Sequence, residues 1–234
     1  MTPEIEKRKI KWLPLEANPE VWNKIIHENG VDPSWQFTDV YGFDPELLAM
    51  VPQPVKAIIF LFPLTDAYEK DRLEEQEKLS ANPPTIDSST FFFKQTISNA
   101  CGMIGLLHSL ANNQDIITNK DGLFNNIFTK TSNMTPDERA TFLETCEPLA
   151  SIHASSAQEG QTSAPSLDEQ IYLHFICFVN VNGQLYELDG RKPYPIHHGS
   201  CDNLLEDAAV VMRKFIARDP QECNFNAIAL SKFD

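Results

Sequence analysis

The sequence predicts a single α+β domain, and three patterns carry that prediction. A near-continuous apolar run over residues 55–62 is typical of a central strand covered on both faces. Two apolar segments flank Asn182 and Gly183, a dipeptide that favours a β-hairpin. Capped amphipathic helices fill much of the remaining chain, no internal repeat is visible, and 234 residues suit one domain with its own core.

The helices that precede the strand over residues 55–62 can be predicted from their N-terminal caps. Asn18 can cap a helix whose first residue is Pro19, and apolar side chains recur at helical spacing until Gly30 ends it. Residues 35–41 predict a short strand. Asp44, followed by proline and glutamate, predicts a short second helix.

After the central strand, the sequence predicts a strongly charged helix over 65–79 and a proline-containing loop over 80–89. Three phenylalanines, residues 91–93, lead into a turn and then into an apolar, core-like helix beginning near Cys101. A cysteine at this position would be mounted on a rigid element.

The second half of the chain begins with a helix over 123–128 and a capping box at Thr135 that opens a helix to about Cys146. Residues 151–168 are mostly small or polar, so we expect a lid or substrate loop there; the alternative is a passive linker. A helix over 202–218 and an apolar strand over 225–230 follow.

The composition limits the classes of partner. Lys and Arg total 19 against 33 Asp and Glu, for a net charge of −14. This charge repels nucleic acid and anionic membranes, so we expect a neutral or basic partner; the alternative is that acidity only keeps the protein soluble. The charged N-terminus lacks the apolar core of a signal peptide. We therefore expect a cytoplasmic protein, with the nucleus as a second possible compartment.

Metal and cofactor chemistry are not indicated. The five cysteines form an odd set without a CxxC pair, which favours neither a disulfide framework nor a zinc cage. His27, His197 and His198 have no ligand partners at useful spacing, and no glycine-rich phosphate or dinucleotide motif is present. We expect no metal and no cofactor.

Cys101 is the candidate nucleophile. It lies at the start of a helix, where unpaired backbone N–H groups and the helix dipole favour a thiolate. Gln95 precedes it by six residues and could donate to an oxyanion together with the Cys101 N–H group. The alternative is that Cys101 is a buried, inert side chain of the core.

The predicted hairpin supplies an acid–base pair. If its turn centres on Asn182 and Gly183, His174 lies at about the level of Gly190 or Arg191, so Asp189 is close across the ladder. A carboxylate beside an imidazole fixes its tautomer and stabilises the imidazolium. The alternatives are a core histidine and a strand-end aspartate, and His108, two turns beyond Cys101, is most simply structural.

Three segments carry a resemblance to a known family. Residues 95–102 (QTISNACG), 173–176 (LHFI) and 186–193 (YELDGRKP) resemble the catalytic segments of the ubiquitin carboxyl-terminal hydrolases. Residues 12–20, 44–48, 159–162 and 225–230 resemble the short, single-domain L-type members. The resemblance implies Cys101 as nucleophile, Gln95 as oxyanion donor, His174 as general base and then acid, and Asp189 as its orienter.

The same resemblance implies the rest of the architecture and the substrate. The fold would be papain-like, with a mainly antiparallel central sheet flanked by helices and a knotted backbone, in one domain over 1–234. Residues of about 151–169 would form the crossover loop through which the tail of ubiquitin threads. The implied substrate-binding residues are Pro14, Leu15, Glu16, Ala17, Asn18 and Pro19, then Ala157, Gln158, Glu159, Gly160, Gln161, Thr162, Ser163 and Ala164, and finally Glu222, Phe225 and Asn226.

By this resemblance the protein is a monomeric cysteine protease that removes small adducts or short extensions from the C-terminal glycine of ubiquitin, or of a ubiquitin-like modifier. One alternative is a protein that binds and stabilises ubiquitin, with incidental hydrolase activity. A weaker alternative is a general papain-like protease that cleaves unfolded peptides.

Overall fold

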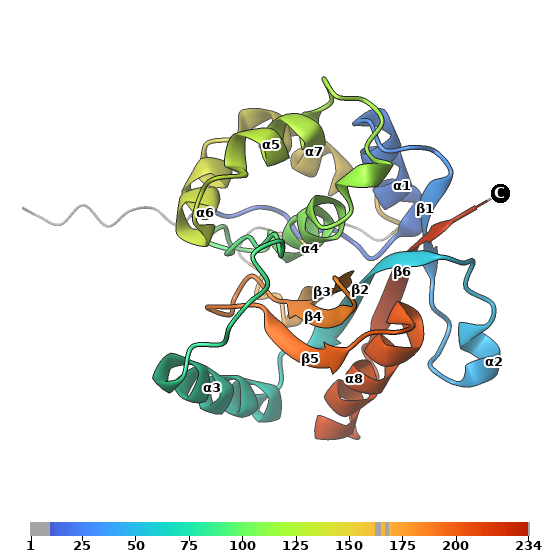
Figure 1. The fold of residues 1–234 in the computed structure, drawn as a ribbon, viewed down its shortest axis with the longest axis vertical. Coiled ribbons are helices and arrows are strands. Elements are labelled where there is room, and N and C mark those ends of the chain that lie inside the picture. Colours follow the sequence, from blue (N-terminus) through green and yellow to red (C-terminus); the bar gives the residue numbers. More distant parts are fainter. Residues whose placement is uncertain (1–9, 162–164, 167–168, 234) are drawn as a thin grey trace, which may run out of the picture.

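A six-stranded sheet with helices on both faces forms the molecule (Figure 1). The structure is a computed structural model and describes residues 10–161, 165–166 and 169–233. All strand pairs are antiparallel, in the order β1-β6-β2-β3-β4-β5. The strands are β1 (Trp35–Asp39), β2 (Val55–Pro63), β3 (Leu173–Val181), β4 (Gln184–Leu188), β5 (Ile196–Ser200) and β6 (Asn226–Lys232). The predicted α+β class is confirmed, while a knotted backbone stays a prediction.

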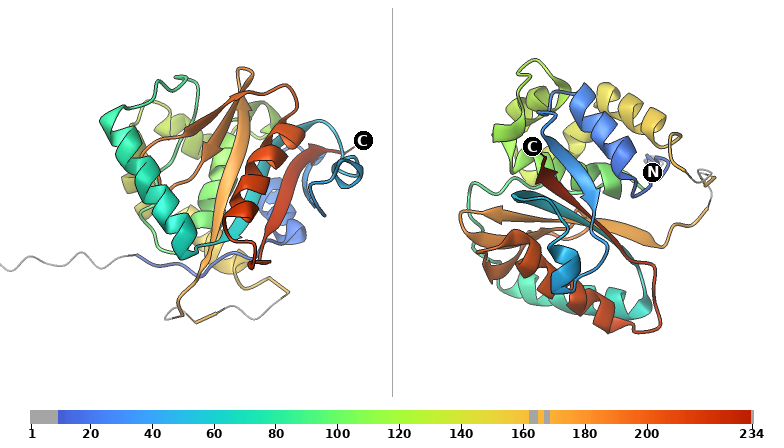
Figure 2. Two further views of the ribbon diagram at one scale, coloured as in Figure 1. Left: turned by 90° about the horizontal axis from the view of Figure 1, so that it is seen from below. Right: turned by 90° about the vertical axis from the view of Figure 1, so that its right-hand side faces the viewer.

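The helices divide between the two faces. One group covers the face on which α4 lies, and α2, α3 and α8 cover the other; the views of Figure 2 show the same division. The helices are α1 (Pro19–Glu28), α2 (Pro45–Leu48), α3 (Asp66–Ala81), α4 (Cys101–Ala111), α5 (Leu123–Thr131), α6 (Pro136–Glu144), α7 (Glu147–Ser156) and α8 (Leu204–Arg218). Two separate apolar cores result, one on each face of the sheet.

Strand β2 is central, as its apolar run predicts. It pairs with β6 on one side and β3 on the other. Ala57 and Ile59 enter the core beneath α4, whereas Ile58 and Phe60 enter the core beneath α8. Burial of successive side chains on opposite faces explains why the run does not alternate with polar residues.

The turn between β3 and β4 sets the position of the acid–base pair. Asn182 and Gly183 have φ angles of 52° and 75°, the left-handed conformation that a two-residue hairpin turn requires. The register pairs Cys177 with Leu188. Strand β4 ends at Leu188, so Asp189 lies just beyond the ladder.

Residues 151–156, expected to belong to the loop, are instead the second half of α7. In this second half the buried side chains are His153 and Ser156, which is why its composition suggests a loop. His153 is 1% exposed, its Nε2 lies 2.6 Å from the Leu13 carbonyl oxygen, and its ring packs at a tilt against Trp12. The helix predicted to run to about Cys146 likewise ends at Glu144, and the irregular segment begins at Ala157.

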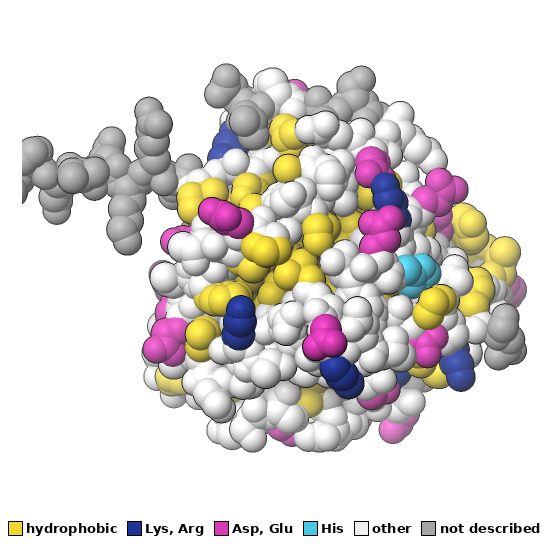
Figure 3. Space-filling model, turned by 90° about the horizontal axis from the view of Figure 1, so that it is seen from above, with side chains coloured by type: hydrophobic (Ala, Val, Ile, Leu, Met, Phe, Trp, Pro, Cys, Tyr) yellow, Lys and Arg dark blue, Asp and Glu magenta, His cyan; other side chains and the backbone are white. Residues whose placement is uncertain are grey.

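Figure 3 looks onto the outer side of the helices that lie above α4, where apolar side chains gather in a patch bordered by charged ones. Partly buried apolar residues of α5, α6 and α7, including Leu123, Phe142 and Ile152, pack against the core in this layer. No helix within the described residues is long and apolar enough to cross a membrane.

Candidate active site

Cys101 is the first residue of α4, at the end that carries the positive pole of the helix dipole. No side chain of the described part of the chain caps this helix. Asn99, two residues before the helix, has a φ of 62° and donates to the Trp12 carbonyl oxygen at 3.1 Å. The first-turn amides of α4 are therefore not capped by a side chain and favour a negative charge on the sulfur.

The imidazole of His174 acts on the pKa of the Cys101 thiol through its charge and through hydrogen bonding. Burial raises the pKa of Cys101, but the hydrogen bond and charge of His174, with backbone hydrogen bonds from Phe175 and Gly102, outweigh it. The pKa of Cys101 therefore lies below the ordinary thiol value. This environment supports a thiolate–imidazolium pair.

The other side of the His174 ring faces Asp189. Its Nε2 lies 2.7 Å from Asp189 Oδ1, so Nδ1 is the nitrogen left for the sulfur. Burial lowers the pKa of His174, but the charge and hydrogen bond of Asp189 overcome this and raise it to about 9. Burial raises the pKa of Asp189, yet the His174 charge, its hydrogen bond and Lys192 hold it well below its usual range.

Gln95 lies next to this pair. Its backbone N–H donates to the Gly190 carbonyl oxygen at 2.8 Å, and its side-chain Nε2 donates to Ile97 at 3.1 Å. A Cβ atom at Gly190 would lie only 2.8 Å from that of Gln95, so a glycine is required for this approach. One amide hydrogen of Gln95 is thus available for an oxyanion near Cys101.

The N-terminal segment and the start of the loop meet above Cys101. A cavity of about 230 Å³ contains the cysteine and is lined mainly by apolar side chains, including Leu15, Ala157 and Phe175. Of the expected substrate-binding residues, its lining contains Pro14, Leu15, Glu16, Ala17, Ala157 and Gly160. The structure therefore brings the two predicted substrate segments to the nucleophile.

The next expected substrate-binding residues are described by the structure but do not line this cavity. Asn18 caps α1 by accepting from Glu20 N at 3.0 Å, and Pro19 begins that helix. Glu159 pairs with Lys24 at 2.7 Å, and the Gln161 N–H donates to Glu16 at 2.6 Å.

The expected substrate-binding residues near the C-terminus, Glu222, Phe225 and Asn226, do not line the cavity. Phe225 stacks on Phe60, and Asn226 pairs in register with Leu61, which does line the cavity. Glu222 precedes them and is half-buried. Gln158 is exposed, while Thr162, Ser163 and Ala164 lie outside the described residues.

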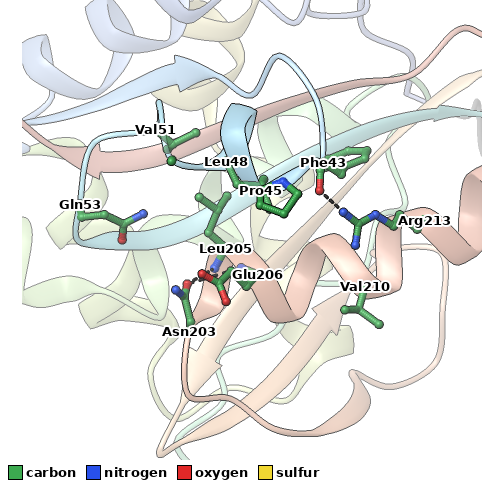
Figure 4. A pocket seen from close by; sticks show the side chains of 11 residues that line it. Phe43, Pro45, Leu48, Val51, Gln53, Asn203, Leu205, Glu206, Val210 and Arg213 are labelled. Carbon is green, nitrogen blue, oxygen red and sulfur yellow. Dashed lines mark hydrogen bonds between the residues drawn. The ribbon is translucent and has the colours of Figure 1, made fainter.

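A larger cavity of about 540 Å³ lies between α2 and α8 (Figure 4). Phe43 and Pro45 face Leu205 across it, and Arg213 donates to the Phe43 carbonyl oxygen. Its lining contains neither a cysteine nor a histidine, so among the described residues it offers none of the chemistry found at Cys101.

The other histidines have structural contacts. His108 is fully buried with Nε2 3.0 Å from the Phe93 backbone nitrogen, and burial lowers its pKa to about 4. His197 and His198 lie on β5 beside Gln184 and Glu187. The strand β5 itself was not predicted, and neither was a contact of Tyr68, whose hydroxyl group lies 3.0 Å from Asp189 Oδ2.

Comparison with known proteins agrees with this arrangement. Residues 12–217 match the sequence model of ubiquitin carboxyl-terminal hydrolase, family 1. The chain is 45% identical over 214 residues to a ubiquitin carboxyl-terminal hydrolase of Aplysia californica, covering 90% of this chain and 97% of that protein. It is 43% identical over 222 residues to the human isozyme L1, covering 94% of this chain and 97% of the isozyme.

A solved structure resembles the fold. It is the Trichinella spiralis UCH37 catalytic domain bound to ubiquitin vinyl methyl ester, with a TM-score of 0.71 and 23% identity, covering 95% of this chain and 96% of that one. The fold, the arrangement around Cys101 and the match of the family model over most of the sequence lead to one assignment: this chain belongs to the ubiquitin carboxyl-terminal hydrolase family 1.

Proposed function

We propose that this protein is a deubiquitinating cysteine hydrolase that cleaves the bond after the C-terminal glycine of ubiquitin. The observation that carries the proposal is the pair of His174 and Asp189, 2.7 Å apart, which acts on Cys101 in the lining of an apolar cavity, with a lowered thiol pKa and a raised imidazole pKa. The names of the relatives support ubiquitin as the substrate, and the vinyl methyl ester complex of the Trichinella protein supports ubiquitin binding.

In this mechanism the Cys101 thiolate attacks the carbonyl carbon after the terminal glycine. Gln95 and the Cys101 N–H group donate to the oxyanion, and His174 gives its proton to the leaving amine as the C–N bond breaks. His174 then takes a proton from water, which attacks the thioester and releases ubiquitin and the free enzyme. Asp189 holds the ring in one tautomer throughout.

We further propose that the substrates are small adducts or short extensions, because the segment from Ala157 lies against residues 14–17 beside the nucleophile. A net charge of −14 supports a basic partner. A ubiquitin-like modifier as a second substrate, a monomeric state and a cytoplasmic or nuclear location belong to the same proposal.

The test compares two fluorogenic substrates. One carries the fluorophore on the C-terminus of intact ubiquitin, and the other on a peptide with only the last residues of ubiquitin. We expect a far higher kcat/KM for intact ubiquitin, because remote contacts with the folded domain contribute to transition-state binding. Equal values would favour a general papain-like protease, and binding without release would favour a ubiquitin-binding protein.

The pKa values predict the pH dependence of this hydrolysis. The rate needs Cys101 as thiolate and His174 as imidazolium, so kcat/KM should fall when pH rises through the His174 pKa of about 9. It should also fall at acidic pH, as the thiolate with its lowered pKa takes up a proton. A profile of kcat/KM against pH checks this, and an alkaline limb near the ordinary histidine value would contradict it.

A further inference from the structure

Tyr68 is a buried hydroxyl group beside the reacting side chains that the mechanism above does not use. It belongs to the first turn of α3, is 3% exposed, and donates to Asp189 Oδ2 at 3.0 Å. The hydrogen bond joins residues 121 positions apart in the sequence.

The strand register places Tyr68 there. At the end of β2, Phe62 pairs in register with His174. Thr65 then caps α3 by accepting from the Tyr68 backbone N–H at 3.2 Å, so the helix begins directly beside the site. The Phe62 ring lies 4.7 Å from the Tyr68 ring and 5.8 Å from that of His174, and Phe215 packs on the same tyrosine. Tyr68 is therefore held by packing as well as by its hydroxyl group.

The hydrogen bonds to Asp189 use both carboxylate oxygens. Oδ1 accepts from His174 at 2.7 Å and from the Arg191 backbone N–H at 2.9 Å, whereas Oδ2 accepts from Tyr68. Asp189 is 0% exposed. Without the Tyr68 hydroxyl group, Oδ2 would be buried without this donor, and the carboxylate could rotate away from His174.

Two ion pairs hold α3 against the same stretch of chain. Glu69 pairs with Arg191 at 2.7 Å, and Glu75 pairs with Lys192 at 2.6 Å. Together with Tyr68, these contacts link the first three turns of α3 to residues 189, 191 and 192. These contacts fix α3 against the segment that contains Asp189.

We propose that Tyr68 is a positioning residue of the hydrolase: its hydroxyl group fixes the plane of the Asp189 carboxylate, so that Oδ1 stays on His174 Nε2. This role rests on the proposed function.

Tyr68→Phe removes only the hydroxyl group and keeps the ring between Phe62 and Phe215. We expect kcat to fall about tenfold with KM unchanged, as for other outer partners of reacting side chains. We expect the His174 pKa, read by NMR titration without substrate, to fall by about half a unit, because the carboxylate is no longer held on Nε2. The alkaline limb of kcat/KM should move down with it.

The charged groups around His174 and Asp189 are the same in the wild-type protein and in Tyr68→Phe. They are Cys101 on α4, Glu187 on β4, Arg191 and Lys192 beyond it, and Glu69 and Arg218 beside Tyr68. A shift of the His174 pKa would therefore report the missing hydroxyl group.

Tyr186→Phe is the matched control. Its hydroxyl group is also largely enclosed but accepts from the Asp87 backbone N–H at 3.3 Å, away from His174. We expect it to behave as wild type. If Tyr68→Phe has the same kcat and His174 pKa as Tyr186→Phe, or loses kcat with an unmoved His174 pKa, the positioning role is overturned. No release by the wild-type protein would instead overturn the hydrolase function, and this proposal with it.

Discussion

Cys101→Ala should show no release of a fluorophore from ubiquitin at any enzyme concentration for which the wild-type rate is measurable. Among the described residues that line the cavity, the substitution removes the only atom that can form the thioester, and neither Gln95 nor His174 can replace it. Alanine is small and suits a helix, so the fold should persist. The measurement is steady-state release beside an assay of ubiquitin binding.

Cys146→Ala is the control for this experiment, because Cys146 is a free cysteine outside both the cavity lining and the expected substrate-binding segments. It should retain the wild-type rate. Ubiquitin binding should survive in Cys101→Ala, which separates the chemistry from the binding. Residual turnover in Cys101→Ala would remove Cys101 from the mechanism, and a cellular role that survives the substitution would favour the ubiquitin-binding alternative.

Asp189→Asn should lower kcat by about 10⁴, the size of effect known when the orienting carboxylate of a catalytic triad becomes an amide. The carboxylate raises the His174 pKa to about 9 against the opposing effect of burial. An amide has no charge, so burial would then lower the His174 pKa below its ordinary value, and the imidazolium would be lost at neutral pH. The Cys101 thiolate would lose its counter-ion at the same time.

The rate of Cys101 alkylation against pH measures this second effect directly, since thiolate and not thiol reacts. In Asp189→Asn the alkylation pKa should rise towards that of a free cysteine. Asp115→Asn is a suitable comparison, because Asp115 is exposed and pairs with Lys56 at 2.6 Å at the surface. A kcat for Asp189→Asn within tenfold of wild type would contradict the assigned role of Asp189.

The features that could be predicted from the sequence are those determined by local chemistry. The Asn182-Gly183 turn, the capping box at Thr135 and the apolar run of β2 each depend on neighbouring residues, and all three are confirmed. The hairpin turn also fixes a register, and for that reason the closeness of His174 and Asp189 could be predicted without coordinates.

The features that could not be predicted depend on tertiary contacts. The second half of α7 has few large apolar residues because its buried side chains are Ser156 and His153, and the partner of His153 lies 140 positions away. Strand β5 is polar and pairs only with β4 at the edge of the sheet, so it lacks the alternation that identifies a strand. The contact of Tyr68 with Asp189 likewise follows from how β2 meets β3.

The position of β6 has a consequence for how the chain folds during synthesis. This strand is formed by the last described residues, yet it lies between β1 and β2 in the middle of the sheet. Until the ribosome has released residues 226–232, β1 has no neighbour and β2 exposes an unpaired edge. The sheet can therefore be completed only after residues 226–232 have been synthesised, and the edge of β2 stays open until β6 inserts.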